Sequence, residues 1–216
     1  MSAPDLRDRI ARDLKPARPL PPPSRRALVL LPVAVAIVVG VPLVNAFRGD
    51  MAVIGFLRAW GFSIGQAAAG LTIIAVALRE SIPGRSLPRV ALAGVLLAGI
   101  AIPAGVLLLT ASRFDIGPSA GVAFPEGLAC FRVSALAALP SLGLAGLLAA
   151  RALPLRPVAA GSLYGLGSGL TADAGLRLYC DYTTPGHILF SHIGAVAAML
   201  VVGAALAWGI ERVRRR

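Results

Sequence analysis

The chain has 216 residues, of which 57% are hydrophobic and 14% are charged, and its net charge is +11. A soluble domain carries about a quarter charged residues, and a disordered chain carries far fewer apolar ones, so this composition excludes both classes. The mean hydropathy is +0.80. A strongly basic chain often binds nucleic acid, but long apolar runs make a membrane the better partner for this one. The sequence predicts an integral membrane protein that has no direct contact with nucleic acid.

The first 26 residues precede the first long apolar run and form a separate tail. A serine cap with a proline and an acid in the first turn is typical of a helix start. Leu6, Ile10 and Leu14 then recur every four residues among charged neighbours such as Arg7, which predicts an amphipathic helix over about 3–15. A proline-rich spacer follows. The helix is suited either to an anionic lipid surface or to a partner protein, and the spacer favours the partner.

Six apolar runs are long enough to cross a bilayer, which needs about 20 helical residues. Each is bounded by charge, proline or a polar turn, and none alternates like a membrane strand. Backbone groups in lipid must be satisfied internally, so we expect an all-α bundle of six transmembrane helices. The expected helices cover residues 27–47, 57–78, 89–110, 128–150, 158–178 and 188–210, with a basic end at 211–216.

The orientation follows from the distribution of basic residues. Most of the 21 lysine and arginine residues lie in the tail, the second and fourth connections and the C-terminal end. Cytoplasmic loops carry the excess of positive charge, so both termini are expected in the cytoplasm. Arginine greatly outnumbers lysine, which is typical of a GC-rich bacterial genome. We therefore expect a multi-pass protein of the bacterial inner membrane, in contact with lipid.

The fifth expected helix carries an ionisable pair. Asp173 lies about one turn from its outer end, and Arg177 follows four residues later, a spacing that permits an ion pair on one helix face. Gly161, Gly165 and Gly169 have the same spacing and would let a neighbouring helix approach closely, pointing the acid into the bundle. Intramembrane charges mark either structural pairs or ion pathways. The lack of a second intramembrane acid favours the structural alternative.

Cys130 and Cys180 are the only cysteines. They lie at the outer ends of two helices that a short inner loop makes antiparallel neighbours, so we expect them to be close together on the periplasmic side. That compartment is oxidising, which permits a disulfide. The pair would be either a structural staple or a redox sensor. His187 and His192 lie nearby in the sequence, so transient binding of a soft metal by all four side chains is a second possibility. We expect no resident cofactor.

Several short segments together resemble the NrsF family of membrane anti-sigma factors, which regulate extracytoplasmic-function sigma factors negatively. They are GLACFR at 127–132, LPLRP at 153–157 with AG at 160–161, CD at 180–181 and SHIG at 191–194. The resemblance covers essentially the whole chain, including a short tail before six helices. The chain departs from the family at Ser191, where an aromatic residue is usual.

The resemblance implies a mechanism and a partner. In the family, the tail holds a sigma factor at the membrane, and two cysteines are needed for the response to oxidative or heavy-metal stress. Carried over, Cys130 and Cys180 become the sensor. Our own inference adds Leu6, Arg7, Ile10 and Leu14 as the sigma-factor contact. The glycine-rich helix faces would also permit a homo-oligomer.

Two other classes of function compete with this one. A small six-helix transporter or channel would use Asp173, but helices one to three and four to six show no convincing inverted repeat. An enzyme is rejected, because no catalytic triad, metal-ligand triad or acid pair can be assembled at one depth. A membrane-embedded anti-sigma factor remains the expected function.

Overall fold

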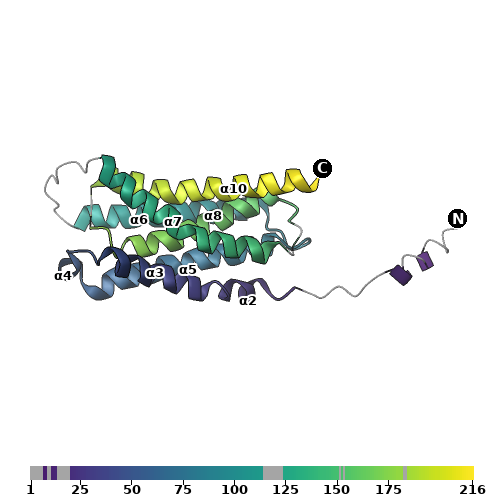
Figure 1. The fold of residues 1–216 in the computed structure, drawn as a ribbon, viewed down its shortest axis with the longest axis horizontal. Coiled ribbons are helices and arrows are strands. Elements are labelled where there is room, and N and C mark those ends of the chain that lie inside the picture. Colours follow the sequence, from purple (N-terminus) through teal and green to yellow (C-terminus); the bar gives the residue numbers. More distant parts are fainter. Residues whose placement is uncertain are drawn as a thin grey trace.

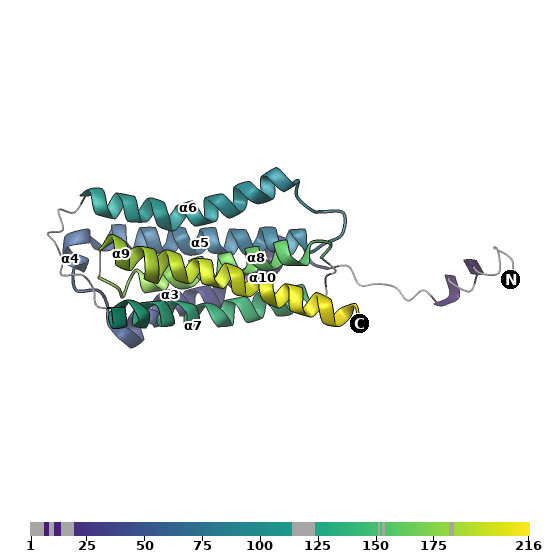
Figure 2. The same ribbon diagram turned by 90° about the horizontal axis from the view of Figure 1, so that it is seen from above.

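The structure is a bundle of long helices lying side by side (Figures 1 and 2). The computed structural model describes residues 7–8, 11–13, 20–113, 124–150, 152, 154–181 and 184–216. Within these ranges every regular element is helical. Arg7 is an exposed helical residue, whereas Leu6, Ile10 and Leu14 lie outside the described residues.

The long helices lie side by side and are joined at the two ends of the bundle. In chain order they are α2 (Pro23–Leu28), α3 (Leu31–Asn45), α4 (Met51–Ile54), α5 (Phe56–Glu80), α6 (Arg89–Arg113), α7 (Phe124–Ala149), α8 (Pro157–Leu176), α9 (Pro185–His187), the π-helix η1 (Ile188–Ile193) and α10 (Gly194–Arg214). Figures 1 and 2 show α2 beginning and α10 ending at the same end of the bundle, which we call the tail end. The opposite end holds Cys130 and Cys180 and is called the cysteine end.

Five helical segments are long and apolar enough to cross a membrane: Pro23–Asn45, Phe56–Glu80, Arg89–Val106, Gly127–Ala149 and Pro185–Arg214. They correspond to five of the six expected spans. The sixth, expected at 158–178, is the helix α8, but it is not among these five segments. The reason is its composition, since α8 is rich in glycine, serine and threonine where the other helices carry leucine and valine.

Helical structure extends beyond several of the expected spans, most clearly in the last helix. The last helix is expected over 188–210, but helical structure begins at Pro185 and includes a six-residue π-helix before α10. The basic end expected at 211–216 is not separate, because α10 continues to Arg214. Basic side chains near a helix C-terminus interact favourably with its dipole, which explains why the helix extends into the charged segment.

The helix α8 lies at the centre of the bundle and is covered on several sides. Every residue from 163 to 176 is buried. By contrast, Val44, Leu57 and Val90 on the surrounding helices are 84%, 86% and 85% exposed. Exposed apolar side chains of this kind suit helices that face lipid. The surrounding helices therefore provide the apolar outer surface, and α8 forms the interior.

Glycines on α8 let α10 approach it closely. Gly161, Gly165 and Gly169, the ridge that the sequence predicts, all face α10. A Cβ built on Gly165 would fall on the backbone carbonyl of Met199, and one on Gly161 would fall on the carbonyl of Gly203. Backbone contact at this distance is possible only without side chains, so the ridge fixes the position of α10.

Two further glycines serve other neighbours of α8. A Cβ on Gly167 would lie 2.6 Å from the carbonyl oxygen of Gly70 in α5. A Cβ on Gly175 would lie 2.7 Å from the carbonyl oxygen of Ile37 in α3. Real Cβ atoms do not approach a backbone oxygen so closely, because the two atoms repel each other well inside the usual van der Waals contact distance of about 3.5 Å. Glycine is thus required on three sides of the same helix.

This packing generates a prediction for Gly165→Ala. The added methyl group must push α8 and α10 apart, and overpacking of this kind costs about 1–3 kcal/mol of stability. We expect a lower melting temperature for the purified chain in detergent. The control is Gly61→Ala in α5, where nothing lies within 4 Å of the new Cβ and alanine favours the helix. Equal loss of stability in both variants would contradict the account of the ridge.

Candidate functional site

The two cysteines and one histidine meet at the cysteine end. Cys130 lies in the second turn of α7, and Cys180 lies four residues beyond the end of α8. Their sulfur atoms are 3.9 Å apart, with no disulfide between them. The Nε2 atom of His187 lies 3.1 Å from the Cys180 sulfur. All three side chains are buried, and their potential ligand atoms lie within 4.8 Å of one another. We call these three residues the thiol–imidazole cluster.

Local structure holds each member of the cluster in place. The backbone N–H of Cys180 donates to the Leu176 carbonyl over 2.7 Å and so ties Cys180 to the end of α8. The Ser191 hydroxyl in η1 donates to the Gly127 carbonyl in α7 over 2.9 Å. The first bond is local to the end of α8, and the second joins η1 to the first turn of α7. The two thiols lie together, as the sequence predicts, and one of the two histidines joins them. Three potential metal ligands therefore do meet at one depth, where the sequence indicated no such triad.

A buried carboxylate lies beside the cluster, deeper in the bundle. Asp173 in α8 has no exposed surface. One carboxylate oxygen lies 2.5 Å from His192 Nδ1, and the other accepts hydrogen bonds from Gln66 over 2.6 Å and from Arg177 over 3.2 Å. Arg177 also donates to the Gln66 side-chain oxygen over 2.9 Å. We call Asp173, Arg177, Gln66 and His192 the carboxylate network.

The network bears on the two alternatives for Asp173. Both of its oxygens are engaged by side chains from α5, α8 and the last helix, so the charge is compensated inside the protein. Most of the hydrogen-bonding capacity of the pair is met, although one terminal guanidinium nitrogen of Arg177 is buried without a partner among the described residues. This arrangement favours the structural role over an ion pathway. It also explains why a glycine-rich helix carries the acid, since only a fully enclosed helix offers partners on several sides.

A π-helix places the two histidines next to each other. In an α-helix, residues five apart point in different directions, because one turn takes 3.6 residues. In a π-helix, hydrogen bonds join residues five apart. His187 immediately precedes η1 and His192 lies within it, and their ring centroids are 5.9 Å apart. The cluster and the network are therefore in contact through two imidazole rings.

Sequence reasoning missed three contributors to this region. Gln66 is a polar residue within the second expected span, and the sequence groups His192 with the metal candidates; in the structure both are partners of Asp173. Arg48 was not singled out, although it pairs with Asp50 over 2.5 Å and donates to the Arg177 carbonyl over 3.1 Å. One signal was available, because Arg48 and Arg177 are among the few basic residues away from the basic ends and loops.

Polar contacts at the tail end connect α2, which directly follows the tail, to the rest of the bundle. The Arg26 guanidinium of α2 is buried and donates to the Leu148 carbonyl near the end of α7. The carboxylate of Glu80 accepts a hydrogen bond from the Leu87 N–H over 2.8 Å and lies 3.6 Å from Arg156. These contacts attach α2 to α7, close the connection between α5 and α6, and hold Arg156, which directly precedes α8, beside that connection.

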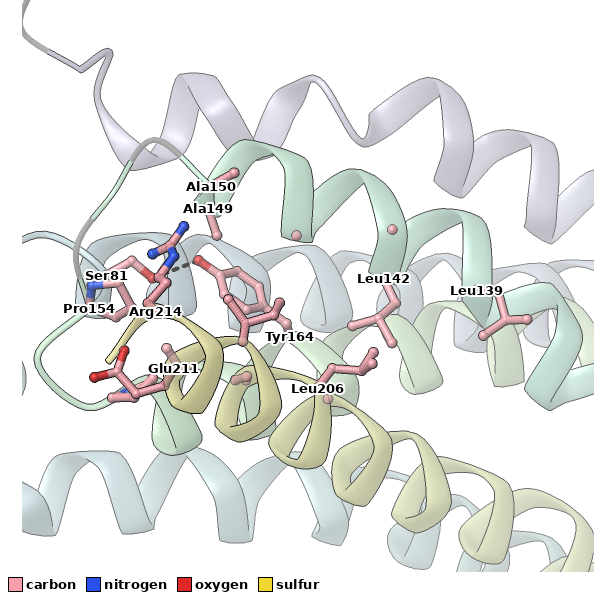
Figure 3. Close-up of a pocket in the computed structure, with 18 residues that line it drawn as sticks. Ser81, Leu139, Leu142, Ala149, Ala150, Pro154, Tyr164, Leu206, Glu211 and Arg214 are labelled. Atoms are coloured by element: carbon pink, nitrogen blue, oxygen red, sulfur yellow. Dashed lines mark hydrogen bonds between the residues drawn. The ribbon is translucent and has the colours of Figure 1, made fainter. Parts of the chain in front are cut away.

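A cavity of about 370 Å³ opens between α7, α8 and α10 towards the tail end. Figure 3 shows Leu139, Leu142 and Leu206 along its wall, with Glu211 and Arg214 nearer the ends of the helices. The Ser81 and Tyr164 hydroxyls, 2.8 Å apart, are hydrogen-bonded beside it. Apart from these four polar side chains the lining is apolar, so the cavity is suited mainly to apolar contacts.

Comparison with known proteins gave one match. A family model described as NrsF, negative regulator of sigma F, matches residues 10–212. No curated protein and no solved structure matches the chain. The matched range includes all members of the thiol–imidazole cluster and of the carboxylate network.

The carboxylate network generates a prediction for Asp173→Asn. Removing the charge leaves Arg177, whose side chain is 11% exposed, without its counter-ion, and breaking a buried pair in this way costs up to about 3–5 kcal/mol. We expect a clear fall in the melting temperature of the purified chain. Glu211→Gln makes the same chemical change in a pair with Arg215 that is largely exposed, where a loss of at most about 1 kcal/mol is expected. Similar melting temperatures for the two variants would show that the network does not hold the bundle together.

Proposed function

The chain belongs to the NrsF family, negative regulators of sigma F, and on that premise we propose how it regulates its partner. Membership makes it a negative regulator of a sigma factor, and its protein partner is that sigma factor. The family is regulatory and is not an enzyme class. The proposal is that the tail sequesters an extracytoplasmic-function sigma factor at the membrane and that stress at the cysteine pair releases it.

The proposed arrangement in the membrane uses all six expected helices. The helix α8 has 20 residues, which at 1.5 Å per residue span about the 30 Å of a bilayer core. The neighbouring helices cover α8, so α8 can cross the bilayer with a lower hydropathy than theirs. Exposed basic residues gather at the tail end: Arg25, Arg212, Arg214, Arg215 and Arg216. The positive-inside rule then puts both termini in the cytoplasm and the cysteine end in the periplasm of a bacterial inner membrane.

The proposed sigma-factor contact is the apolar stripe of the tail. Leu6, Ile10 and Leu14 would pack against an apolar groove of the sigma factor, with Arg7 beside them, as amphipathic helices commonly bind. A bound sigma factor would be held near the membrane and away from RNA polymerase. The hydrogen bond from Arg26 to α7 makes the position of α2 depend on the bundle. This supports the proposal that a change in the bundle reaches the tail, which precedes α2.

The proposed sensor is the pair Cys130 and Cys180. The 3.9 Å between their sulfur atoms supports a joint role in oxidative or heavy-metal stress. A single helix, α7, runs from Cys130 at the cysteine end to Leu148 at the tail end, where Arg26 of α2 contacts it. A change in the thiols would bias the bundle between two arrangements, and α7 would carry the difference to α2 and the tail.

The experiment that tests the proposal is recovery of a sigma factor from unstressed bacterial membranes. The full chain should retain one, and a chain lacking residues 2–22 should not. The triple variant Leu6→Ala, Ile10→Ala and Leu14→Ala should lose most of the recovery as well, because buried apolar anchors dominate binding energy. Arg12→Gln, on the charged side of the helix, is the matched control and should retain the partner. Equal recovery with and without the tail would refute the proposed contact.

A further inference from the structure

We propose that Cys130, Cys180 and His187 form a binding site for a soft divalent cation such as Zn²⁺ or Cd²⁺, with His187 as the third ligand. The proposal rests on the proposed function, since it names the event at the cysteine end that alters the bundle. Thiolate and imidazole are the side chains that such ions prefer.

The spacing of the sulfur atoms fits a shared ion. Two thiolates bound to one tetrahedral Zn²⁺ at about 2.3 Å lie about 3.8 Å apart, and the larger Cd²⁺ needs slightly more. The observed separation of Cys130 and Cys180 is 3.9 Å. Sulfur atoms joined in a disulfide lie about 2.05 Å apart. The side chains are therefore arranged for coordination before any ion binds, whereas a disulfide would require both sulfurs to move.

His187 supplies the third potential ligand atom, its Nε2 nitrogen. His187 Nε2 lies 3.1 Å from the Cys180 sulfur and within 4.8 Å of the Cys130 sulfur. Nitrogen and sulfur ligands on one tetrahedral ion lie about 3.6 Å apart, so small side-chain rotations suffice. His192 is not part of the group of side chains whose potential ligand atoms lie within 4.8 Å of one another, and its Nδ1 atom lies 2.5 Å from the Asp173 carboxylate.

The charge balance suits a buried position. Cys130, Cys180 and His187 are 3%, 4% and 5% exposed, and an isolated charge at such depth is unfavourable. Two thiolates, one neutral imidazole and one divalent cation form a neutral complex. Binding breaks both S–H bonds and releases two protons to solvent, while two metal–sulfur bonds and one metal–nitrogen bond form. No oxidant or reductant is needed.

The ligands come from three separate elements, which gives binding a structural consequence. Cys130 belongs to α7, Cys180 follows α8, and His187 ends α9 just before η1. One ion would hold these three chain segments together at fixed distances. Three protein ligands also leave one tetrahedral position for solvent, and such open sites differ from the closed four-ligand sites that are purely structural. Reversible capture of an ion is the expected behaviour.

Titration of the purified full chain with Cd²⁺ in detergent, without oxygen, tests the site. The ultraviolet charge-transfer absorbance of thiolate–Cd²⁺ bonds should saturate at one ion per chain. His187→Gln should weaken binding at least about tenfold, and Cys130→Ser or Cys180→Ser should abolish the absorbance. The control is Glu211→Gln, which removes a carboxylate at the tail end, away from the thiol–imidazole cluster, and should bind Cd²⁺ close to the wild-type affinity.

A measurement on the unaltered chain guards against variants that fail to fold. Cd²⁺ should raise the melting temperature of the wild-type chain, because a ligand of the folded state stabilises it, and Mg²⁺, which prefers oxygen ligands, should not. Absence of Cd²⁺ binding, or binding unaffected by His187→Gln, would overturn the site. If Cd²⁺ binds as described but the chain recovers no sigma factor, the proposed function fails and the site stands. If the chain recovers a sigma factor but does not bind Cd²⁺, the site fails and the proposed sigma-factor contact stands.

Discussion

Close approach of backbones around α8 is the constraint on which the rest of the structure depends. Gly165, Gly167 and Gly175 face three different helices at distances where no side chain would fit. Helices in lipid gain little from burying apolar surface against one another, so packing of this kind has to supply the association energy. Because α8 is enclosed, it does not need an apolar surface, and its sequence is free to carry polar groups.

That freedom explains where the chemistry-bearing residues lie. Asp173 is tolerated in the bundle because His192, Gln66 and Arg177 surround it. The thiol–imidazole cluster lies where α8 ends, next to this network through the two imidazole rings. An ionisable residue in a membrane is costly unless it is paired, and here the pairing joins α5, α8 and the last helix. The cluster is thus attached to the most densely connected part of the protein.

The proposed sensor and the attachment of the proposed sigma-factor contact lie at opposite ends of the bundle. The cysteine end holds the thiols, and the tail end holds Arg26 and the attachment of α2 to α7. The helix α7, which contains Pro140, is one continuous element with contacts at both ends, from Cys130 to Leu148. Coupling between the two ends requires two arrangements of the bundle with different affinities for the stimulus.

Sequence reasoning reached the features that depend on spacing along one helix. The apolar runs, the four-residue step from Asp173 to Arg177 and the glycine ridge are all of this kind, because helix geometry alone relates such positions. The partnership of Asp173 with Gln66 and His192 was out of reach, since it depends on how three helices are rotated relative to one another. The π-helix η1 was likewise not predictable from the apolar pattern of the sequence. Hydropathy also favoured six similar spans, whereas α8 is an interior helix of different composition.

The central claim is that the thiols control the hold on the sigma factor, and one measurement tests it most directly. The chain is reconstituted in vesicles with its sigma factor bound, and release is followed after a thiol oxidant or Cd²⁺ is added at the cysteine end. The account predicts release from the wild-type chain and none from Cys130→Ser or Cys180→Ser, with equal binding beforehand. Equal release from the wild-type chain and both variants would contradict it.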